Sequence, residues 1–151
     1  MNNAEIASRF ERLGQLMTIR GEEGFRTRAY RNAAGTIAAM QTPLAEIARR
    51  EGLKGLQEIP GVGKAISAKI LELIERSTFE AWERLTAETP ETTLDLLTID
   101  GIGIKTAAAL YQRFKISSLD DLRKFVEGGG LELVDGIGEK TAERIKRNAK
   151  R

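Results

Sequence analysis

Apolar residues recur at helical intervals along almost the whole chain, and no segment alternates apolar and polar residues as a strand does. In the first segment the apolar positions are three or four residues apart: Ile6, Phe10, Leu13 and Met17. This spacing predicts an amphipathic helix with one buried face. The Gly21–Gly24 segment interrupts the pattern, and we expect the helix to end there.

The same periodicity predicts further short helices. A second helix is expected from Phe25 to about Met40, and Pro43 stands near the first turn of a third, at 44–50, where its missing N–H is tolerated. Further short helices are expected at 78–87, 91–98 and 118–127. We therefore predict an all-α fold of about ten short helices.

A glycine pattern occurs three times: IPGVGKAISAKI at 59–70, IDGIGIKTAAAL at 99–110 and VDGIGEKTAERI at 134–145. The first glycines, Gly61, Gly101 and Gly136, are 40 and 35 residues apart. A small residue follows six positions after each of them: Ser67, Ala107 and Ala142. Each copy predicts a short helix, a tight hairpin and a longer helix.

The hairpin glycines have two interpretations. A turn between two helices uses glycine for steric reasons alone, so one copy indicates little. Three copies with matching apolar flanks favour a second role, in which outward-facing amides at a helix start bind a phosphate.

Composition excludes several classes of chemistry. The chain has no cysteine and no histidine, so disulfides and thiolate catalysis are absent and zinc or binuclear metal hydrolysis is not expected. No apolar segment has the length of a membrane span, and no secretory leader follows Met1. We expect a cytoplasmic or nucleoid location.

The net charge of +2 comes from 24 basic and 22 acidic residues. Residues 1–76 carry 12 basic and 9 acidic side chains, whereas residues 77–151 carry 12 and 13. If DNA is the partner, charge attracts it to the N-terminal half. The C-terminal half must then bind through main-chain donors.

Lys69 has no lysine counterpart in the other copies, where Ala109 and Arg144 stand. It lies at the edge of an apolar stripe that includes Ile66 and Leu73. Partial burial disfavours an ammonium ion, and a neutral amine can form a Schiff base with a carbonyl carbon. Arg144 stays protonated, so it can bind a phosphate but is not a candidate nucleophile. The alternative is a surface lysine whose stem covers apolar surface.

The segment GFRTRAYRNAA at 24–34, taken with the first hairpin, resembles the N-terminal lyase domain of family X DNA polymerases, the DNA polymerase beta family, especially bacterial members. The second hairpin and LDDLRKF at 119–125 resemble the DNA-binding subdomain that follows. The resemblance implies a small helical lyase-like domain at 1–78 and a tandem helix-hairpin-helix DNA-binding domain at 79–151.

The resemblance also implies roles for single residues. Lys69 falls on the family's Schiff-base nucleophile and Tyr30 on a tyrosine near it; a second lysine of the phosphate pocket falls on Ala65. Phe25 falls on an aromatic that stacks on a template base, although Phe25 and Tyr30 can also be core aromatics; Trp82 is assigned to packing. The candidate DNA-binding residues are Phe25, Arg26, Arg31, Gly61, Val62, Gly63, Lys64, Gly101, Ile102, Gly103, Lys105, Thr106, Gly136, Ile137, Gly138, Lys140 and Thr141.

No cofactor is required for these roles. The glycine pattern resembles the helix-hairpin-helix motif, in which a hairpin often holds a monovalent cation, sodium or potassium, between its carbonyls and a phosphate. The corresponding carbonyls here are those of Ile99, Gly101, Val134 and Gly136.

We therefore expect sequence-independent binding of gapped, nicked or abasic DNA in base excision repair, with 5′-deoxyribose phosphate lyase activity as a candidate reaction. The family's palm and its carboxylate pair are not in this sequence, so the chain as it stands is not expected to polymerise DNA. Three alternatives stay open: a non-catalytic DNA-binding or adaptor protein, hairpins that serve protein association, and a fragment of a longer family X polymerase. No membrane partner is expected.

Overall fold

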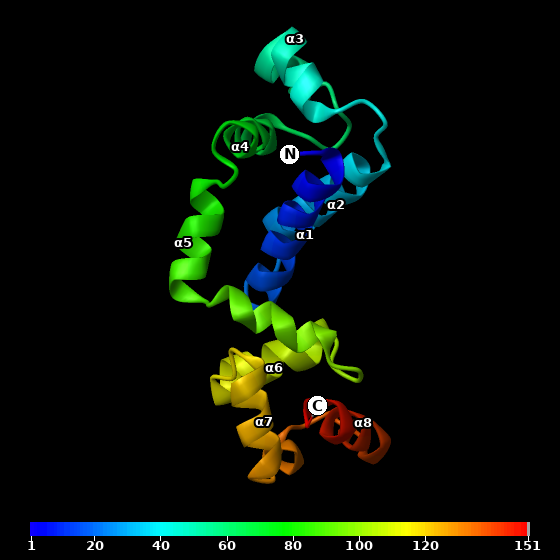
Figure 1. Cartoon of the computed structure of the whole chain (residues 1–151), viewed down its shortest axis with the longest axis vertical. Helices are drawn as coiled ribbons and strands as arrows, with labels where there is room; N and C mark the ends of the chain where they lie inside the picture. Colours follow the sequence, from blue (N-terminus) through cyan, green and yellow to red (C-terminus); the bar gives the residue numbers. More distant parts are fainter. Residues whose placement is uncertain (151) are drawn as a thin grey trace. The chain divides into compact units, whose positions relative to one another are not determined.

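The computed structural model describes residues 1–150, and within that range helices joined by short connections form the fold, with no strand (Figure 1). The predicted all-α fold is confirmed. The elements are α1 (Asn3–Arg20), α2 (Phe25–Ala39), α3 (Leu44–Gln57), α4 (Lys64–Arg76), α5 (Glu80–Glu88), η1 (Glu91–Thr98), α6 (Ile104–Phe114), α7 (Leu119–Glu127), η2 (Gly130–Leu133) and α8 (Glu139–Ala149).

Two elements differ from the sequence prediction. The helix predicted at 44–50 continues to Gln57, with a break at Gly52, where φ is 65° and ψ is −155°. That conformation is accessible to glycine and strained for other residues, so the apolar pattern alone does not show it. The segment 91–98 forms the 3₁₀ helix η1 rather than an α-helix, and Pro90 precedes it.

The residues divide into two compact units. Unit 1 comprises Met1–Gly14 and Glu23–Leu85, and unit 2 comprises Gln15–Glu22 and the chain from Thr86 onward. Helix α1 therefore contributes residues to both units. No helix within residues 1–150 is both long and apolar enough to cross a membrane.

The core of unit 1 is formed by the apolar faces of its helices and contains an aromatic cluster. The Phe10 ring lies 6.1 Å from that of Tyr30 and 5.6 Å from that of Phe79, centroid to centroid. Trp82 is buried, and the Arg12 guanidinium carbon lies 5.6 Å from its ring centroid. Helix α3 packs against α4, which buries one stripe: Ile66, Ile70 and Leu73.

The beginning of α1 is tied to the beginning of α3 by one side chain. The Asn3 amide nitrogen donates to the Thr42 carbonyl at 2.8 Å, and its oxygen accepts the Leu44 N–H at 2.8 Å. Since the first amides of α3 have no partners within their own helix, Asn3 satisfies one of them. These bonds fix the connection that leads from α2 into the hairpin-bearing part of unit 1.

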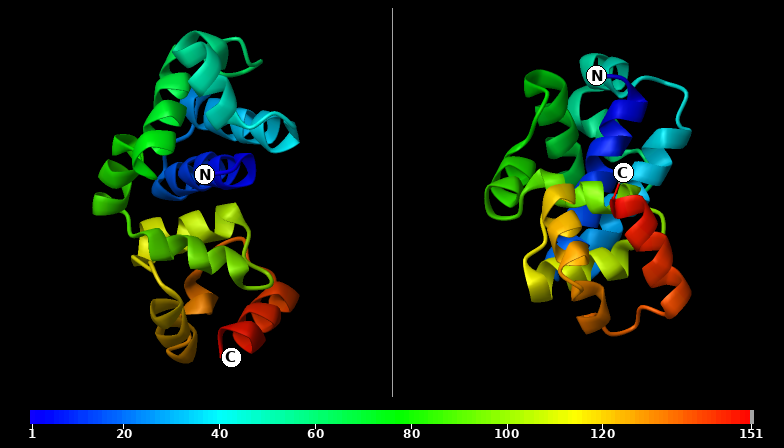
Figure 2. Two further views of the ribbon diagram at one scale, coloured as in Figure 1. Left: turned by 45° about the horizontal axis from the view of Figure 1, so that its top comes forward. Right: turned by 60° about the horizontal axis from the view of Figure 1, so that its bottom comes forward.

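In unit 2, helix α7 packs against η1, η2 and α8. Figure 2 draws the chain from η1 to α8 in yellow-green to red. The Phe114 and Phe125 rings lie 4.8 Å apart, centroid to centroid. The Gln112 amide donates to the Ile19 carbonyl at 2.9 Å, which ties α6 to the last turns of α1. This arrangement holds two of the three glycine hairpins in one compact unit.

Candidate functional site

The three glycine hairpins, which we number hairpin 1 (residues 59–63), hairpin 2 (99–103) and hairpin 3 (134–138), have the same backbone turn. Their first glycines, Gly61, Gly101 and Gly136, have φ values of 80°, 101° and 85°. Only glycine adopts this left-handed region without strain. The steric interpretation therefore accounts for the first glycine of each pair.

The second glycine of each pair begins a helix. Gly63, Gly103 and Gly138 are the N-cap residues of α4, α6 and α8, and none of these helices has a side-chain cap. In each case the glycine carbonyl accepts the N–H four residues later at 2.9 Å, from Ser67, Ala107 and Ala142. The first amides of all three helices are thus left without side-chain partners.

Neither backbone strain nor packing accounts for the second glycines. Gly63, Gly103 and Gly138 have φ values of −85°, −95° and −73°, which any residue adopts. A Cβ built on any of them would meet no atom within 4 Å. Their glycine identity leaves open space in front of the uncapped helix amides.

The first glycines yield a prediction about stability. Replacing Gly101 by alanine is expected to cost more free energy of unfolding than replacing Gly136, although both residues have positive φ. The left-handed conformation costs an alanine about 1–2 kcal/mol at either position. A Cβ at Gly101 would also lie 3.1 Å from Ile145 Cγ1, whereas one at Gly136 would meet nothing. Urea denaturation of both variants measures the difference; equal losses would contradict this account.

Lys69 lies on α4 beside the aromatic cluster of unit 1. Its Nζ is 5.8 Å from the centroid of the Tyr30 ring, and its side chain is half-buried. Tyr30, on α2, is only 6% exposed and packs on Phe10. Within residues 1–150 Lys69 forms no ion pair, and the Tyr30 ring is the group that its ammonium contacts.

An open pocket of about 300 Å³ lies beside Lys69 between α4 and α5; it is lined by Ala65, Ala68, Lys69, Glu72, Glu80, Ala81 and Arg84. Its carboxylates already have partners. Glu72 accepts the Glu80 N–H at 3.0 Å and a bond from Arg76, and Glu80 accepts one from Arg84 at 2.5 Å. The pocket thus contains the ammonium of Lys69, which has no acidic partner, and part of its wall is formed by alanines.

The other predicted contacts of unit 1 are at its surface. Phe25, the first residue of α2, is 82% exposed, so it is not a core aromatic. Arg26 and Lys64 are exposed. Arg31 is committed to Glu11, with both Nε and Nη2 3.2 Å from the same carboxylate oxygen. Three of these four side chains are open to a ligand, and the fourth is already paired.

In unit 2 the predicted side-chain contacts lie at the starts of helices α6 and α8. Lys105 and Lys140 are exposed and Thr106 and Thr141 half-buried. Of the middle residues of the hairpins, Val62 and Ile102 are buried and Ile137 is half-buried. Of the candidate cation ligands, the Ile99 carbonyl accepts the Ile102 N–H at 3.0 Å.

Sequence reasoning missed the pairing of Arg144. This residue was expected to be able to contact a phosphate, but its Nη2 and Nε lie 2.5 and 3.3 Å from the two oxygens of Asp100. The bond from Arg144 holds the pKa of Asp100 below its usual value, and Asp100 raises the pKa of Arg144. One sequence feature could have indicated the pair: an aspartate precedes the first glycine in the second and third copies of the glycine pattern, whereas the first copy has Pro60 there.

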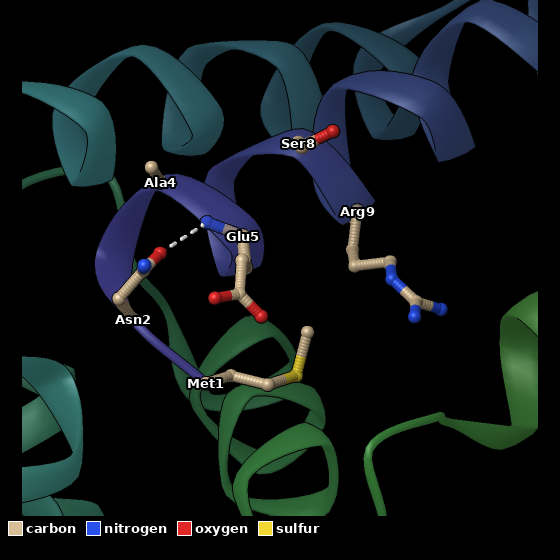
Figure 3. A pocket seen from close by; sticks show the side chains of 6 residues that line it. All are labelled: Met1, Asn2, Ala4, Glu5, Ser8 and Arg9. Carbon is tan, nitrogen blue, oxygen red and sulfur yellow. Dashed lines mark hydrogen bonds between the residues drawn. The ribbon is translucent and has the colours of Figure 1, made fainter.

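A second pocket, of about 340 Å³, lies at the start of α1 and is lined by Met1, Asn2, Ala4, Glu5, Ser8 and Arg9 (Figure 3). The Asn2 side-chain oxygen accepts the Glu5 N–H at 2.8 Å and so caps this helix. No predicted site residue lines it. Within residues 1–150, no group of three or more carboxylates, histidines or cysteines is arranged to hold a metal ion.

Known proteins share these hairpins. Residues 1–79 match the family described as "Helix-hairpin-helix domain", and residues 93–151 match "SAM-like Helix-hairpin-helix tandem". The chain is 26% identical over 145 residues to DNA polymerase/3′-5′ exonuclease PolX of Bacillus subtilis, across 96% of this chain and 24% of that protein. It is 31% identical over 124 residues to human DNA-directed DNA/RNA polymerase mu, across 82% of this chain and 24% of that protein.

A shorter similarity extends to another protein class. The Holliday junction branch migration complex subunit RuvA of Ralstonia nicotianae is 29% identical over 87 residues, across 58% of this chain and 45% of RuvA. The chain spans about a quarter of the length of the two polymerases. The resemblance to family X DNA polymerases is confirmed over most of the chain. On its hairpins and on the match of residues 1–79, this chain belongs to the helix-hairpin-helix domain family.

Proposed function

We propose that this chain binds the sugar-phosphate backbone of DNA through its hairpins, without reading base sequence. One observation carries the proposal: Gly63, Gly103 and Gly138 leave open space in front of uncapped helix amides, with no backbone or packing need for glycine. A phosphate oxygen needs such access, because N–H donors bind it only at close range.

Main-chain binding suits the charge distribution of the chain. Most of unit 2 lies within the nearly neutral C-terminal half, so bulk attraction for DNA is weak there. Lys105 and Lys140 stand near the helix starts and have no ion-pair partner within residues 1–150. Each adds a local positive charge beside the amide donors.

In DNA repair, we propose that unit 1 holds the 5′ side of a gap or nick. Arg26 and Lys64 are exposed and have no ion-pair partner within residues 1–150, and they would contact the 5′-phosphate. Phe25, with most of its ring exposed, would stack on a base. Support comes from the exposure of these side chains and from the similarity of this chain to two DNA polymerases, PolX and polymerase mu.

The candidate reaction at Lys69 is removal of a 5′-deoxyribose phosphate. The neutral amine adds to C1′ of the ring-opened sugar and water leaves, which forms an imine. Loss of the C2′ proton then breaks the C3′–O bond, whose electron pair leaves with the 5′-phosphate of the downstream DNA. Water hydrolyses the imine and frees Lys69. Its half-buried position and the pocket beside it support this proposal.

The contact between Lys69 and Tyr30 also favours a second candidate function. An aromatic face stabilises the charged ammonium, and a charged Lys69 would contact a phosphate without reacting. The protein would then be a non-catalytic DNA-binding or adaptor protein. The two candidates differ in the response of the chemistry to Lys69→Arg, which the Discussion develops.

The exposed aromatic provides a direct test of gap binding. We expect Phe25→Ala to weaken binding to DNA with a one-nucleotide gap by about fivefold to a hundredfold, the range of one lost stacking contact. Its effect on intact duplex should be small, since paired bases offer no free face. Fluorescence anisotropy on both DNAs, at several salt concentrations, measures the difference.

Thermal unfolding is the control for this variant, because a side chain that is 82% exposed contributes little to the core and its loss should not lower Tm. Equal weakening on both DNAs would contradict base stacking. A wild-type affinity that does not fall as salt increases would contradict backbone binding altogether and favour hairpins that serve protein association.

A further inference from the structure

Hairpin 2 is held on helix α8 by two adjacent residues. Asp100 receives two hydrogen bonds from the Arg144 guanidinium, at 2.5 and 3.3 Å. Gly101, the next residue, approaches α8 so closely that a Cβ would lie 3.1 Å from Ile145 Cγ1 and 3.5 Å from the Thr141 carbonyl oxygen. Ile145 is fully buried. The hairpin that begins α6 therefore rests on the helix that begins at hairpin 3.

The equivalent aspartate of hairpin 3 is held much less firmly. Asp135 has one contact with Arg113 of α6, at 3.4 Å, and its side chain is 95% exposed. Asp100 is 61% exposed and Arg144 46%. Hairpin 1 has Pro60 at the same position and lacks this carboxylate. A firmly paired aspartate is thus a property of hairpin 2.

A carboxylate beside a phosphate-binding turn opposes DNA binding by charge repulsion. Its pairing with Arg144 offsets the repulsion and also consumes an arginine that would otherwise attract DNA. An exposed ion pair contributes little to the free energy of unfolding. The Asp100–Arg144 pair is therefore explained neither by a gain in stability nor by attraction for DNA. What it does do is join hairpin 2 to the helix that follows hairpin 3.

We propose that the Asp100–Arg144 pair sets the orientation of hairpin 2 against hairpin 3, so that both present their amides to one DNA backbone surface as a single clamp. Asp100 and Arg144 are positioning residues and do not themselves contact phosphate. This inference rests on the proposed DNA binding and goes beyond it, because it names what aligns two of the hairpins.

The test depends on the sign of the change in affinity. Asp100→Asn removes a negative charge, so charge alone predicts tighter DNA binding; loss of alignment predicts binding weakened about threefold to tenfold, the loss of one hairpin's share of contacts. Asp135→Asn, with the same charge change at the equivalent position, is the matched control and should bind slightly more tightly. Anisotropy titrations with a duplex measure both.

A double-mutant cycle separates alignment from charge. Charge alone predicts that Arg144→Gln weakens binding, and that Asp100→Asn/Arg144→Gln, whose net charge equals that of the wild type, restores it. Alignment predicts that both single variants and the double variant are weakened to similar degrees, because each lacks the same pair. In all three variants, the slope of log affinity against log salt concentration should also become shallower, by the amount expected for the loss of about one phosphate contact.

The outcomes of these titrations distinguish failure of the positioning role from failure of DNA binding. Tighter binding by Asp100→Asn, or recovery in the double variant, would overturn the positioning role while leaving DNA binding intact. Failure of the wild type to bind DNA would instead overturn the proposed function. Thermal unfolding of the three variants close to that of the wild type excludes misfolding as the cause of weaker binding.

Discussion

Lys69→Arg is expected to abolish covalent trapping by borohydride on DNA that carries a 5′-deoxyribose phosphate, while affinity for the same DNA stays within about twofold of the wild type. Borohydride reduces an imine to a stable amine, so the adduct reports the Schiff base itself. An arginine remains protonated and cannot add to the sugar carbonyl. Its guanidinium can still lie over the Tyr30 ring and attract phosphate, as the ammonium does.

Lys54→Arg is the matched control. Lys54 lies on α3 of the same unit, is exposed and has no proposed role in binding or chemistry, so its replacement should leave trapping intact. An undiminished adduct in Lys69→Arg would show that another amine reacts. A wild type that binds gapped DNA but forms no adduct would favour the non-catalytic DNA-binding protein.

The second large effect is expected from the double variant Gly103→Ser/Gly138→Ser. Both glycines are helix N-caps in an extended conformation, and serine is a better N-cap than glycine by a few tenths of a kcal/mol. Nothing lies within 4 Å of either Cβ, so the variant should fold with unchanged or slightly raised stability. Its affinity for duplex DNA should fall by at least about tenfold, because each hydroxymethyl group occupies the phosphate's place and caps its donors.

Urea denaturation measures the stability of the double variant, and DNA titration measures its loss of affinity. Gly35→Ser is the control: Gly35 lies on α2, is exposed, has no atom within 4 Å of a Cβ, and is outside the hairpins. This variant should retain wild-type DNA affinity. A folded double variant that binds DNA as tightly as the wild type would exclude main-chain phosphate binding by hairpins 2 and 3.

The helices and hairpins were predictable because their causes are local. A helix buries one stripe of its own side chains, so spacing such as that of Ile66, Ile70 and Leu73 indicates which face turns inward. A tight turn requires positive φ, so Gly61, Gly101 and Gly136 mark where the backbone reverses. The break at Gly52 was not predicted, because a glycine within a helical pattern marks a break only when its φ and ψ are known.

The candidate site was predictable only in part. The edge position of Lys69 follows from helical periodicity, and the structure finds this side chain half-buried. The ring beside it is Tyr30, which is 39 positions away in the sequence, and their proximity depends on the tertiary packing of unit 1. Arg31 and Phe25 share a helix and a predicted role, yet Arg31 is paired with Glu11 and Phe25 is exposed.

The sequence by itself determined the all-α class, the three glycine hairpins and the single lysine at the edge of an apolar stripe, because each depends on residues within a few turns of one another. Only the tertiary structure decided which charges far apart in the sequence are paired. Asp100 and Arg144 are separated by 44 positions, and an ion pair forms only where folding brings two such side chains within hydrogen-bonding distance. The open space at Gly63, Gly103 and Gly138 was likewise decided by the surrounding chain, since a sequence shows that a residue lacks a Cβ but not what lies in front of it.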